Sequence, residues 1–146
     1  MSFKDALAKA RSNRPEPVLQ AVAVGDELYH VEIRRLDGMD WAAITADCPP
    51  RHERDASMGY DSNKAALIAC RRHGRLLDGD DEPVAMAVIR DDQGNVVDDP
   101  WLNLFNAISG TEADAIAALW WGQNVNDPNK HVVALKKASA GGSKTN

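Results

Sequence analysis

The sequence has few cysteines, few aromatic residues and no long hydrophobic run. Its 146 residues include two cysteines, and 5% of the residues are aromatic. Two cysteines cannot build a disulfide framework, and free thiols suit a reducing compartment. No stretch approaches the roughly 18 apolar residues that a membrane span requires, and residues 1–15 lack the apolar core of a signal peptide. We therefore expect a soluble intracellular protein, and its length suits one domain, since domains commonly hold about 100–150 residues.

Basic residues are outnumbered by acidic ones. Lys and Arg number 17 against 22 Asp and Glu, which gives a net charge of −5. A general nucleic-acid binder needs a basic face for the phosphates, so the charge argues against that class. Residues 78–99 hold eight carboxylates with only Arg90 to offset them. We interpret this acidic stretch as solvated loops and turns.

The first part of the chain predicts a short helix followed by a β-hairpin. Apolar residues at i, i+4 and i+7 predict an amphipathic helix over residues 3–11, with Ser2 as its N-cap. Residues 18–24 and 28–34 are typical of strands. Gly25-Asp26 between them supplies the positive-φ residue that a tight hairpin turn needs.

Two helices are predicted after this hairpin. The first covers residues 39–46, with Asp37 as its cap and a Cys-Pro-Pro stop after it. The second covers residues 63–73, is capped by Asp61 or Ser62, and ends in two arginines and a histidine before a glycine. Cations in the last turn and a glycine after it are the expected terminator of a helix.

The segment from Val84 to Ile89 allows two interpretations. It is either a strand that enters a hairpin at residues 91–95 and returns through Val96-Val97, or a helix that begins with Pro83. We favour the hairpin, because the sequence Gln-Gly-Asn is typical of a turn and lies between two segments rich in β-branched residues.

The last third of the chain predicts three helices. The first opens at Asp99-Pro100 and closes at Gly110, and the second begins with a capping box of Thr111 and Asp114. The third opens at Asp127-Pro128 and ends near residue 138. The predicted fold is therefore α+β: an N-terminal helix and β-hairpin (a small antiparallel sheet) followed by a mainly helical C-terminal part. We expect one compact domain over residues 1–138 and a flexible Gly/Ser tail over residues 139–146.

The usual signatures of an enzyme are missing from the sequence. No Gly-rich phosphate loop follows a predicted strand, and no Gly-x-Ser-x-Gly elbow occurs. Asp80, Asp81 and Glu82 are adjacent, and adjacent carboxylates rarely converge as an acid–base pair. We expect no enzymatic activity, no catalytic residue and no cofactor.

Two cysteines and two histidines form the one constellation with metal-ligand spacing. Cys48 and His52 are four residues apart, and Cys70 and His73 are three apart on one face of a predicted helix. Against a zinc site, Cys48 precedes two prolines, His52 lies in a charged loop, and free cysteine is commonly buried as a small apolar residue. We expect no metal site and keep a zinc-binding module as an alternative.

The adjacent pair Trp120-Trp121 is the most unusual local feature. Neighbours on a helix diverge by about 100°, so both rings cannot enter one narrow core seam. Trp120 shares a side with Ile116 and is expected to be buried, whereas Trp121 lies at the flank with Ala117. Trp121 is either a boundary residue of the core or part of a partner-binding patch, because exposed tryptophan is enriched among binding hot spots.

Several segments in a fixed order carry a resemblance to a known family. They are residues 2–15 (SFKDALAKARSNRP), residues 35–44 (RLDGMDWAAI), Pro49-Pro50-Arg51, Gly59-Tyr60, Ser109-Gly110, Asn126-Asp127-Pro128 and Lys136-Lys137-Ala138-Ser139. In these segments the chain resembles the tail assembly chaperones of long-tailed (siphovirus-type) phages of actinobacteria. Residues 78–97 depart from the family pattern, because they are longer and more strand-like.

The resemblance implies a non-enzymatic protein that binds the tape measure protein and keeps it soluble during tail-tube assembly. It further implies a longer form of the chain, made by a programmed frameshift, and the tail tube protein as partners, with no nucleic acid and no membrane. The expected location is the host cell cytoplasm during assembly and not the mature virion. A holding chaperone needs apolar surface, which we expect from Trp101, Phe105, Trp120 and Trp121, and charge, which the acidic stretch supplies.

Two other functions compete with this interpretation. A virion structural component, such as a neck or tail-terminator subunit, would form a ring with a large self-interface. A small zinc-binding module would use the two cysteines and two histidines described above.

Overall fold

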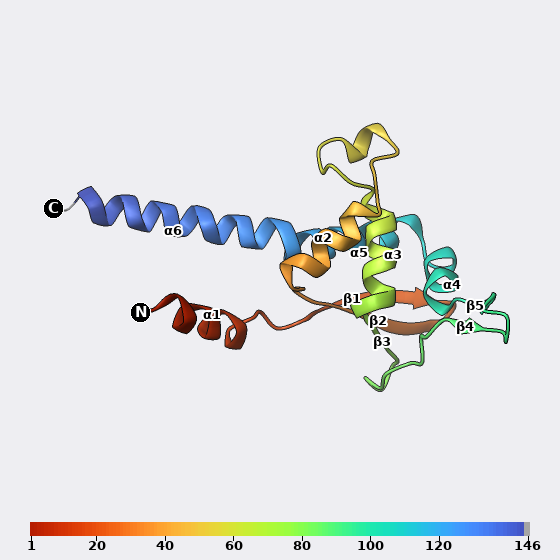
Figure 1. Cartoon of the computed structure of the whole chain (residues 1–146). Coiled ribbons are helices and arrows are strands. Elements are labelled where there is room, and N and C mark those ends of the chain that lie inside the picture. The colour runs from red at the N-terminus through yellow and green to blue at the C-terminus, as the bar shows by residue number, and fades with distance from the viewer. Residues whose placement is uncertain (145–146) are drawn as a thin grey trace.

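The computed structural model describes residues 1–144 and has the predicted α+β class (Figure 1). A three-stranded antiparallel sheet is formed by residues 18–33 and 75–77, and most of the remaining chain is helical. In chain order the elements are α1 (Phe3–Ser12), β1 (Val18–Val24), β2 (Glu27–Ile33), α2 (Gly38–Ala46), the 3₁₀ turn η1 (Glu53–Asp55), α3 (Ser62–His73), β3 (Arg75–Leu77), β4 (Ile89–Arg90), β5 (Val96–Asp98), α4 (Pro100–Ala107), α5 (Gly110–Trp121), the π-helical segment η2 (Gly122–Asn126) and α6 (Asp127–Lys144).

The predicted N-terminal hairpin is confirmed. β1 and β2 pair antiparallel with Val24 opposite Glu27, so that two residues form the turn. Gly25 has a φ of +61° there, which residues with a side chain rarely adopt. Side chains of β1 alternate between a face toward the helices and an exposed face, and Val22 is fully buried on the first.

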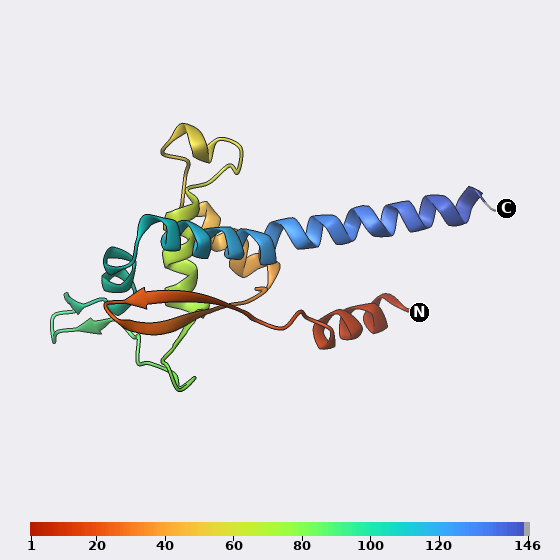
Figure 2. The ribbon, with the colours of Figure 1, turned by 180° about the vertical axis from the view of Figure 1, so that it is seen from behind.

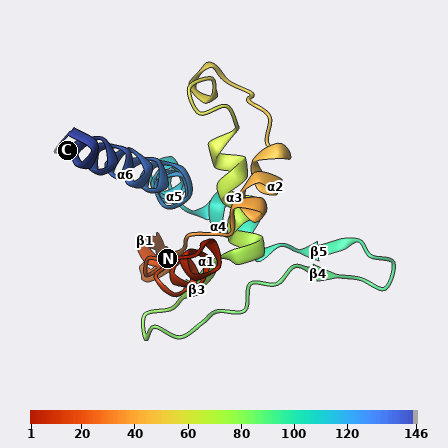
Figure 3. The same cartoon turned by 60° about the vertical axis from the view of Figure 1, so that its left-hand side comes forward.

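The sheet is completed by a strand that the sequence did not predict. β3 pairs antiparallel with β2, which gives the order β1-β2-β3. After β3 the chain makes one isolated bridge, Leu77 with Pro83, but residues 84–97 add no strand to this sheet, and β4 and β5 form a separate two-stranded sheet. The favoured hairpin is confirmed only from Ile89 onward, since residues 84–88 form neither a strand nor a helix. This hairpin projects from the body on the side away from α6 (Figure 3).

The helices cover one face of the three-stranded sheet. α5 packs against β1 and β2, α3 packs against α5, and α2 and α4 pack against α3 (Figure 2). The hydrophobic core lies between these layers and contains two fully buried tryptophans; its largest members are Trp101, Trp120, Ile33, Ile44, Ile116, Val22 and Val31. Within residues 1–144, no helix is long and apolar enough to cross a membrane.

Two predicted caps differ from those in the structure. Asp37 precedes α2 but makes no capping hydrogen bond; its carboxylate pairs instead with Arg14, which lies in the linker between α1 and β1. The capping box of α5 is Ser109 with Glu112, two residues earlier than the predicted Thr111 and Asp114. Gly110 therefore opens α5 and does not close α4, which ends at Ala107.

The predicted break between the last two helices is also wrong. The backbone stays right-handed helical through Gly122 and Asp127, so α5, η2 and α6 form one continuous helix. Pro128 cannot donate a backbone hydrogen bond to the preceding turn. In η2 the pairing shifts by one residue, and the N–H of Asp127 bonds to the carbonyl of Gly122. We attribute the passage of the helix across the proline to this π-helical turn.

Two helical segments leave the body on the same side (Figures 1 and 2). α1 has no buried residue, and every described side chain of α6 beyond Pro128 is exposed. The packed body therefore spans about residues 18–126, which is shorter than the compact domain expected over residues 1–138. Residues 139–144 form the last turns of α6 where a flexible tail was expected, because each added helical residue gains a backbone hydrogen bond. Residues 145–146 of that expected tail lie outside the described residues.

Candidate protein-binding surface

The four aromatic residues predicted to bind a partner have different environments. Trp101 and Trp120 are buried, with 2% and 1% of their surface exposed, and both belong to the core. Their rings offer almost no surface to a partner, which corrects their assignment to the binding surface; for Trp120 the same burial confirms the expectation that it packs beside Ile116. Phe105 and Trp121 are half-buried at the edge of the core. Partner binding by these two residues stays a prediction.

Trp121 lines a groove of about 480 Å³ between α5, the start of α3 and the loop around η1. Met58 from the loop and Ala117 and Ala118 from α5 supply the other apolar lining. At the rim the side-chain amide of Asn63 donates a 3.2 Å hydrogen bond to Asp114 of α5, which holds the two helices together. The groove can receive one or two apolar side chains of a partner.

The loop that closes this groove is shaped by a buried carboxylate. Asp55 is 1% exposed and accepts the backbone N–H groups of Arg51 and His52 at 2.9 and 3.0 Å. These hydrogen bonds hold the pKa of Asp55 below its ordinary value. The loop therefore keeps its own structure over residues 51–60, although the sequence there is polar and without periodicity.

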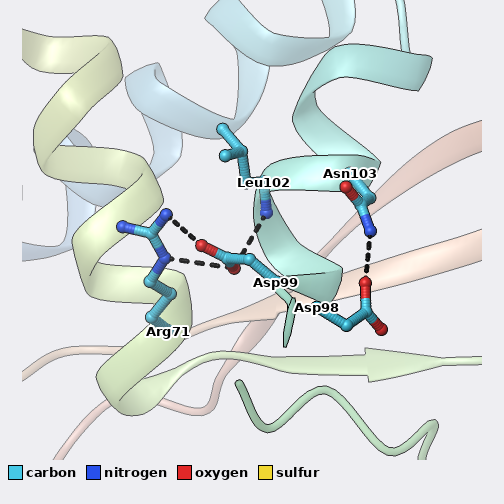
Figure 4. A network of polar contacts seen from close by, with 5 residues as sticks. All are labelled: Arg71, Asp98, Asp99, Leu102 and Asn103. Carbon is cyan, nitrogen blue, oxygen red and sulfur yellow. Dashed lines mark hydrogen bonds and ion pairs between the residues drawn. The ribbon is translucent and has the colours of Figure 1, made fainter. Parts of the chain in front are cut away.

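A second carboxylate positions α4 against α3 (Figure 4). Asp99 caps α4 by accepting the N–H of Leu102 at 3.3 Å, and it pairs with the Arg71 guanidinium at 2.5 Å. Burial alone would raise the pKa of Asp99, but the hydrogen bonds from Arg71 and Leu102 outweigh it and lower the pKa. Beside it, Asn103 donates a 2.8 Å hydrogen bond to Asp98.

The two helices that project from the body, α1 and α6, are called the arms. The α1 arm exposes an apolar stripe that no other part of the described chain covers. Phe3 is 80% exposed and Leu7 is 42% exposed, and with Ala10 they lie on one side of the helix. The helix itself is well terminated: Ser2 accepts the N–H of Asp5 at 3.1 Å, and the last turn carries Lys9 and Arg11. An amphipathic helix without a partner for its apolar side is a candidate protein-binding element.

The α6 arm exposes apolar side chains in the same way. Val132, Val133 and Leu135 are 49–56% exposed. The root of this arm is fixed, because the side chain of Asn124 joins it to the segment after β2. Its Oδ1 accepts the N–H of Leu36 at 2.8 Å, and its Nδ2 donates to the carbonyls of Arg34 and Trp120 at 3.2 and 3.0 Å.

The structure gives no support to a metal site. No group of three or more His, Cys, Asp or Glu side chains that could hold a metal ion occurs in the described part of the chain. Cys48 and Cys70 are both buried with free thiols. Burial raises the pKa of Cys48 and raises that of Cys70 to about 12, so neither thiol is a ready metal ligand.

Sequence reasoning found the groove residue Trp121 but missed the two arms as binding elements. In α1 the spacing of Phe3, Leu7 and Ala10 indicates an amphipathic helix, but this pattern does not say whether another part of the protein covers its apolar side. No sequence pattern marks Asn124, because two of its three hydrogen bonds reach Arg34 and Leu36, which lie 90 and 88 residues earlier in the chain.

Comparison with known proteins identifies no relative. No protein-family model, no curated protein and no solved structure matches the chain.

Proposed function

We propose that the protein is a tail assembly chaperone of long-tailed phages, which binds the tape measure protein and keeps it soluble while the tail tube is built. One observation carries the proposal: two helical arms leave the body on the same side with their large apolar side chains uncovered. The resemblance of residues 2–15 and 35–44 to that family supports the same function. The protein acts by binding alone, with no catalysis.

The arms suit a partner that is itself helical and apolar. A long helical protein exposes apolar faces until the tube encloses it, and such faces aggregate unless another helix covers them. Phe3 and Leu7 on α1 and Val132 and Leu135 on α6 can pack against these faces. The groove beside Trp121 adds a pocket for an anchoring side chain. The carboxylates of residues 78–99 keep the complex in solution.

In this proposal the protein works in the host cytoplasm during assembly and is missing from the finished virion. A longer, frameshifted form of the chain and the tail tube protein are its further partners.

Co-expression with the tape measure protein encoded downstream tests the proposal. We expect the tape measure protein to become soluble and to co-purify with the chain. Replacing Phe3 and Leu7 together by serine should abolish co-purification, because it removes the apolar side of α1.

The matched control removes two exposed apolar side chains from another surface. Leu19 and Leu28 lie on the sheet and are 50% and 55% exposed. Their double serine variant should co-purify like the unaltered chain. If the unaltered chain neither solubilises nor retains the tape measure protein, the proposed function is wrong.

A further inference from the structure

The two arms are basic although the chain is acidic. α1 contains three basic residues and one acidic residue, and α6 contains four lysines and one aspartate. The arms therefore carry a net charge of +5 in a chain of net charge −5, so the remaining residues carry −10. Within residues 1–144, Lys4, Lys9 and Arg11 form no ion pair with the body.

On α1 the charges flank the apolar stripe. At 100° per residue, Lys4 and Arg11 lie on one flank of the Phe3–Leu7 side, whereas Lys9 lies on the polar side beside Asp5. The positions of Lys4 and Arg11 correspond to a flanking site of a helix pair, where side chains meet the charges of the facing helix. An opposing helix therefore meets positive charge on one edge of its contact with α1.

On α6 a lysine lies within the exposed apolar side. Lys136 follows Val132 by four residues and Val133 by three, so the three side chains are neighbours on the helix surface. Val132 and Val133 are half-exposed and have no cover from the body. A partner that packs on the valines must place its own charged group beside Lys136.

We propose that the arms bind an amphipathic helix whose apolar face is edged by aspartate and glutamate. This inference rests on the proposed function, because it states which segments of the tape measure protein the arms take. α1 has ten residues, and a helix of that length is marginally stable alone in water. Packing against an acidic-edged helix would therefore stabilise α1 as well as cover Phe3 and Leu7.

A second copy of the chain fits the arms less well. Arm-to-arm packing would oppose lysines and arginines with lysines and arginines, which is unfavourable. The acidic body offers no helical apolar seam in residues 78–99, and its carboxylates already serve its own turns. Asp78 accepts the N–H groups of Asp80 and Glu82, and Asp91 accepts those of Gln93 and Asn95.

Nucleic acid also fits the arms less well. A phosphate backbone would meet the lysines but would leave Phe3, Leu7 and Leu135 uncovered. The body, with its net charge of −10, would repel a polyanion at close range.

Binding of designed peptides to the full chain tests the inference. Three peptides of about 21 residues, or six helical turns, share one composition of apolar residues. The first has a leucine face edged by glutamate, the second has the same face edged by lysine, and the third is the glutamate peptide in scrambled order. Fluorescence anisotropy should detect binding of the first peptide alone, and the binding should weaken as salt is raised.

Charge-reversal variants locate the site. The double variant Lys4→Glu, Lys136→Glu reverses one charge on each arm. The substitution at Lys4 should not unfold α1, because Lys4 lies in the first turn, where a carboxylate stabilises a helix. This variant should bind the glutamate peptide about tenfold more weakly, because two attractions become repulsions. The control, Arg51→Glu with Lys64→Glu, makes the same change in net charge on the body and should bind as the unaltered chain does. Far-ultraviolet circular dichroism confirms that both variants keep their helices.

The outcomes separate this inference from the proposed function. If the chain solubilises the tape measure protein but binds the lysine and glutamate peptides equally, the inference is wrong and the function stands. If the glutamate peptide binds but the tape measure protein stays insoluble, the function is wrong and the partner chemistry stands. Two other results would overturn the inference. If the unaltered chain self-associates and the double variant Lys4→Glu, Lys136→Glu does not, the arms bind a second copy. If the unaltered chain binds duplex DNA and the double variant does not, the arms bind nucleic acid.

Discussion

The carboxylate of Glu112 accepts a 2.7 Å hydrogen bond from the backbone N–H of Ala23, which lies 89 residues earlier in the chain. β1 is an edge strand of the sheet, so this N–H has no strand partner on that side. The other oxygen of the same carboxylate accepts the N–H and the hydroxyl of Ser109 at 3.0 and 2.9 Å. One side chain thus caps α5 and joins that helix to the edge of the sheet.

Glu112→Gln should destabilise the protein, and the loss of stability should be larger at neutral pH than at acidic pH. The hydrogen bonds from Ala23 and Ser109 lower the pKa of Glu112 in the folded protein. Their stabilisation is therefore complete above the ordinary pKa of glutamate and is lost as the pH falls through the lower, folded pKa. The difference in Tm between the two proteins should be largest near pH 7 and should narrow as the pH falls toward about 3.

Thermal unfolding followed by circular dichroism across this pH range measures the difference. Glu16→Gln is the control, because Glu16 is exposed in the linker before β1 and takes part in no hydrogen bond within residues 1–144. A constant difference in Tm between Glu112→Gln and the unaltered chain at every pH would contradict the prediction.

Asn124→Ala should lower the free energy of unfolding by about 1–3 kcal/mol, because it leaves the N–H of Leu36 and two carbonyls without their partner. Urea unfolding monitored by tryptophan fluorescence gives the value. Asn129→Ala, at an exposed position of α6, should change it by less than about 0.5 kcal/mol. Equal effects of the two substitutions would show that the anchor of the α6 arm contributes nothing to stability.

Replacing the two adjacent tryptophans should have different main effects: Trp120→Ala should chiefly lower stability, and Trp121→Ala should chiefly weaken partner binding. Trp120→Ala removes a side chain that is 1% exposed and should cost about 3–5 kcal/mol of unfolding free energy. Trp121→Ala removes a half-buried ring at the groove, so it should cost less than half as much and weaken partner binding. Urea unfolding and co-purification with the tape measure protein measure the two effects, and a larger loss of stability for Trp121→Ala would place that ring in the core.

Gly74→Ala should destabilise the protein, whereas Gly38→Ala should not. A Cβ at Gly74 would lie 2.8 Å from Cα and 3.0 Å from the carbonyl oxygen of Cys70, and backbone atoms cannot yield cheaply. We expect a loss of about 1–3 kcal/mol there. A Cβ at Gly38 meets nothing within 4 Å, and alanine favours the helix that starts at this residue. Differential scanning calorimetry of the two variants checks the contrast, and an equal fall in Tm would contradict it.

Local chemistry allowed much of the fold to be predicted. The Gly25-Asp26 turn, the Ser2 cap and the Asp99-Pro100 helix start each depend on a few neighbouring residues, and all three are confirmed. β3 could not be predicted in this way, because three residues are too few to show alternation and the strand exists only through its pairing with β2.

The wrong prediction of a helix break in the last third of the chain has a different cause. Asp127-Pro128 is a typical helix start, but the π-helical turn before it carries the helix through, and that turn is supported by Asn124 contacts with a distant segment. The same limitation applies to the site. Residue type assigns Trp101 and Trp120 to a binding surface, whereas the packing of α3, α4 and α5 places them in the core. For Trp120 the helical spacing from Ile116 predicts this burial, but for Trp101 the sequence offers no such sign.

The continuous helix from Gly110 to Lys144 crosses from the hydrophobic core into surrounding water without a break. Its backbone amides therefore belong to two regimes of hydrogen exchange. Those beside Ile116 and Trp120 open only when the body unfolds, whereas those beyond Pro128, on the exposed part of α6, open by local fraying of that helix. The boundary between slow and fast hydrogen exchange therefore lies within one continuous helix. A partner bound to the α6 arm would move that boundary toward the C-terminus.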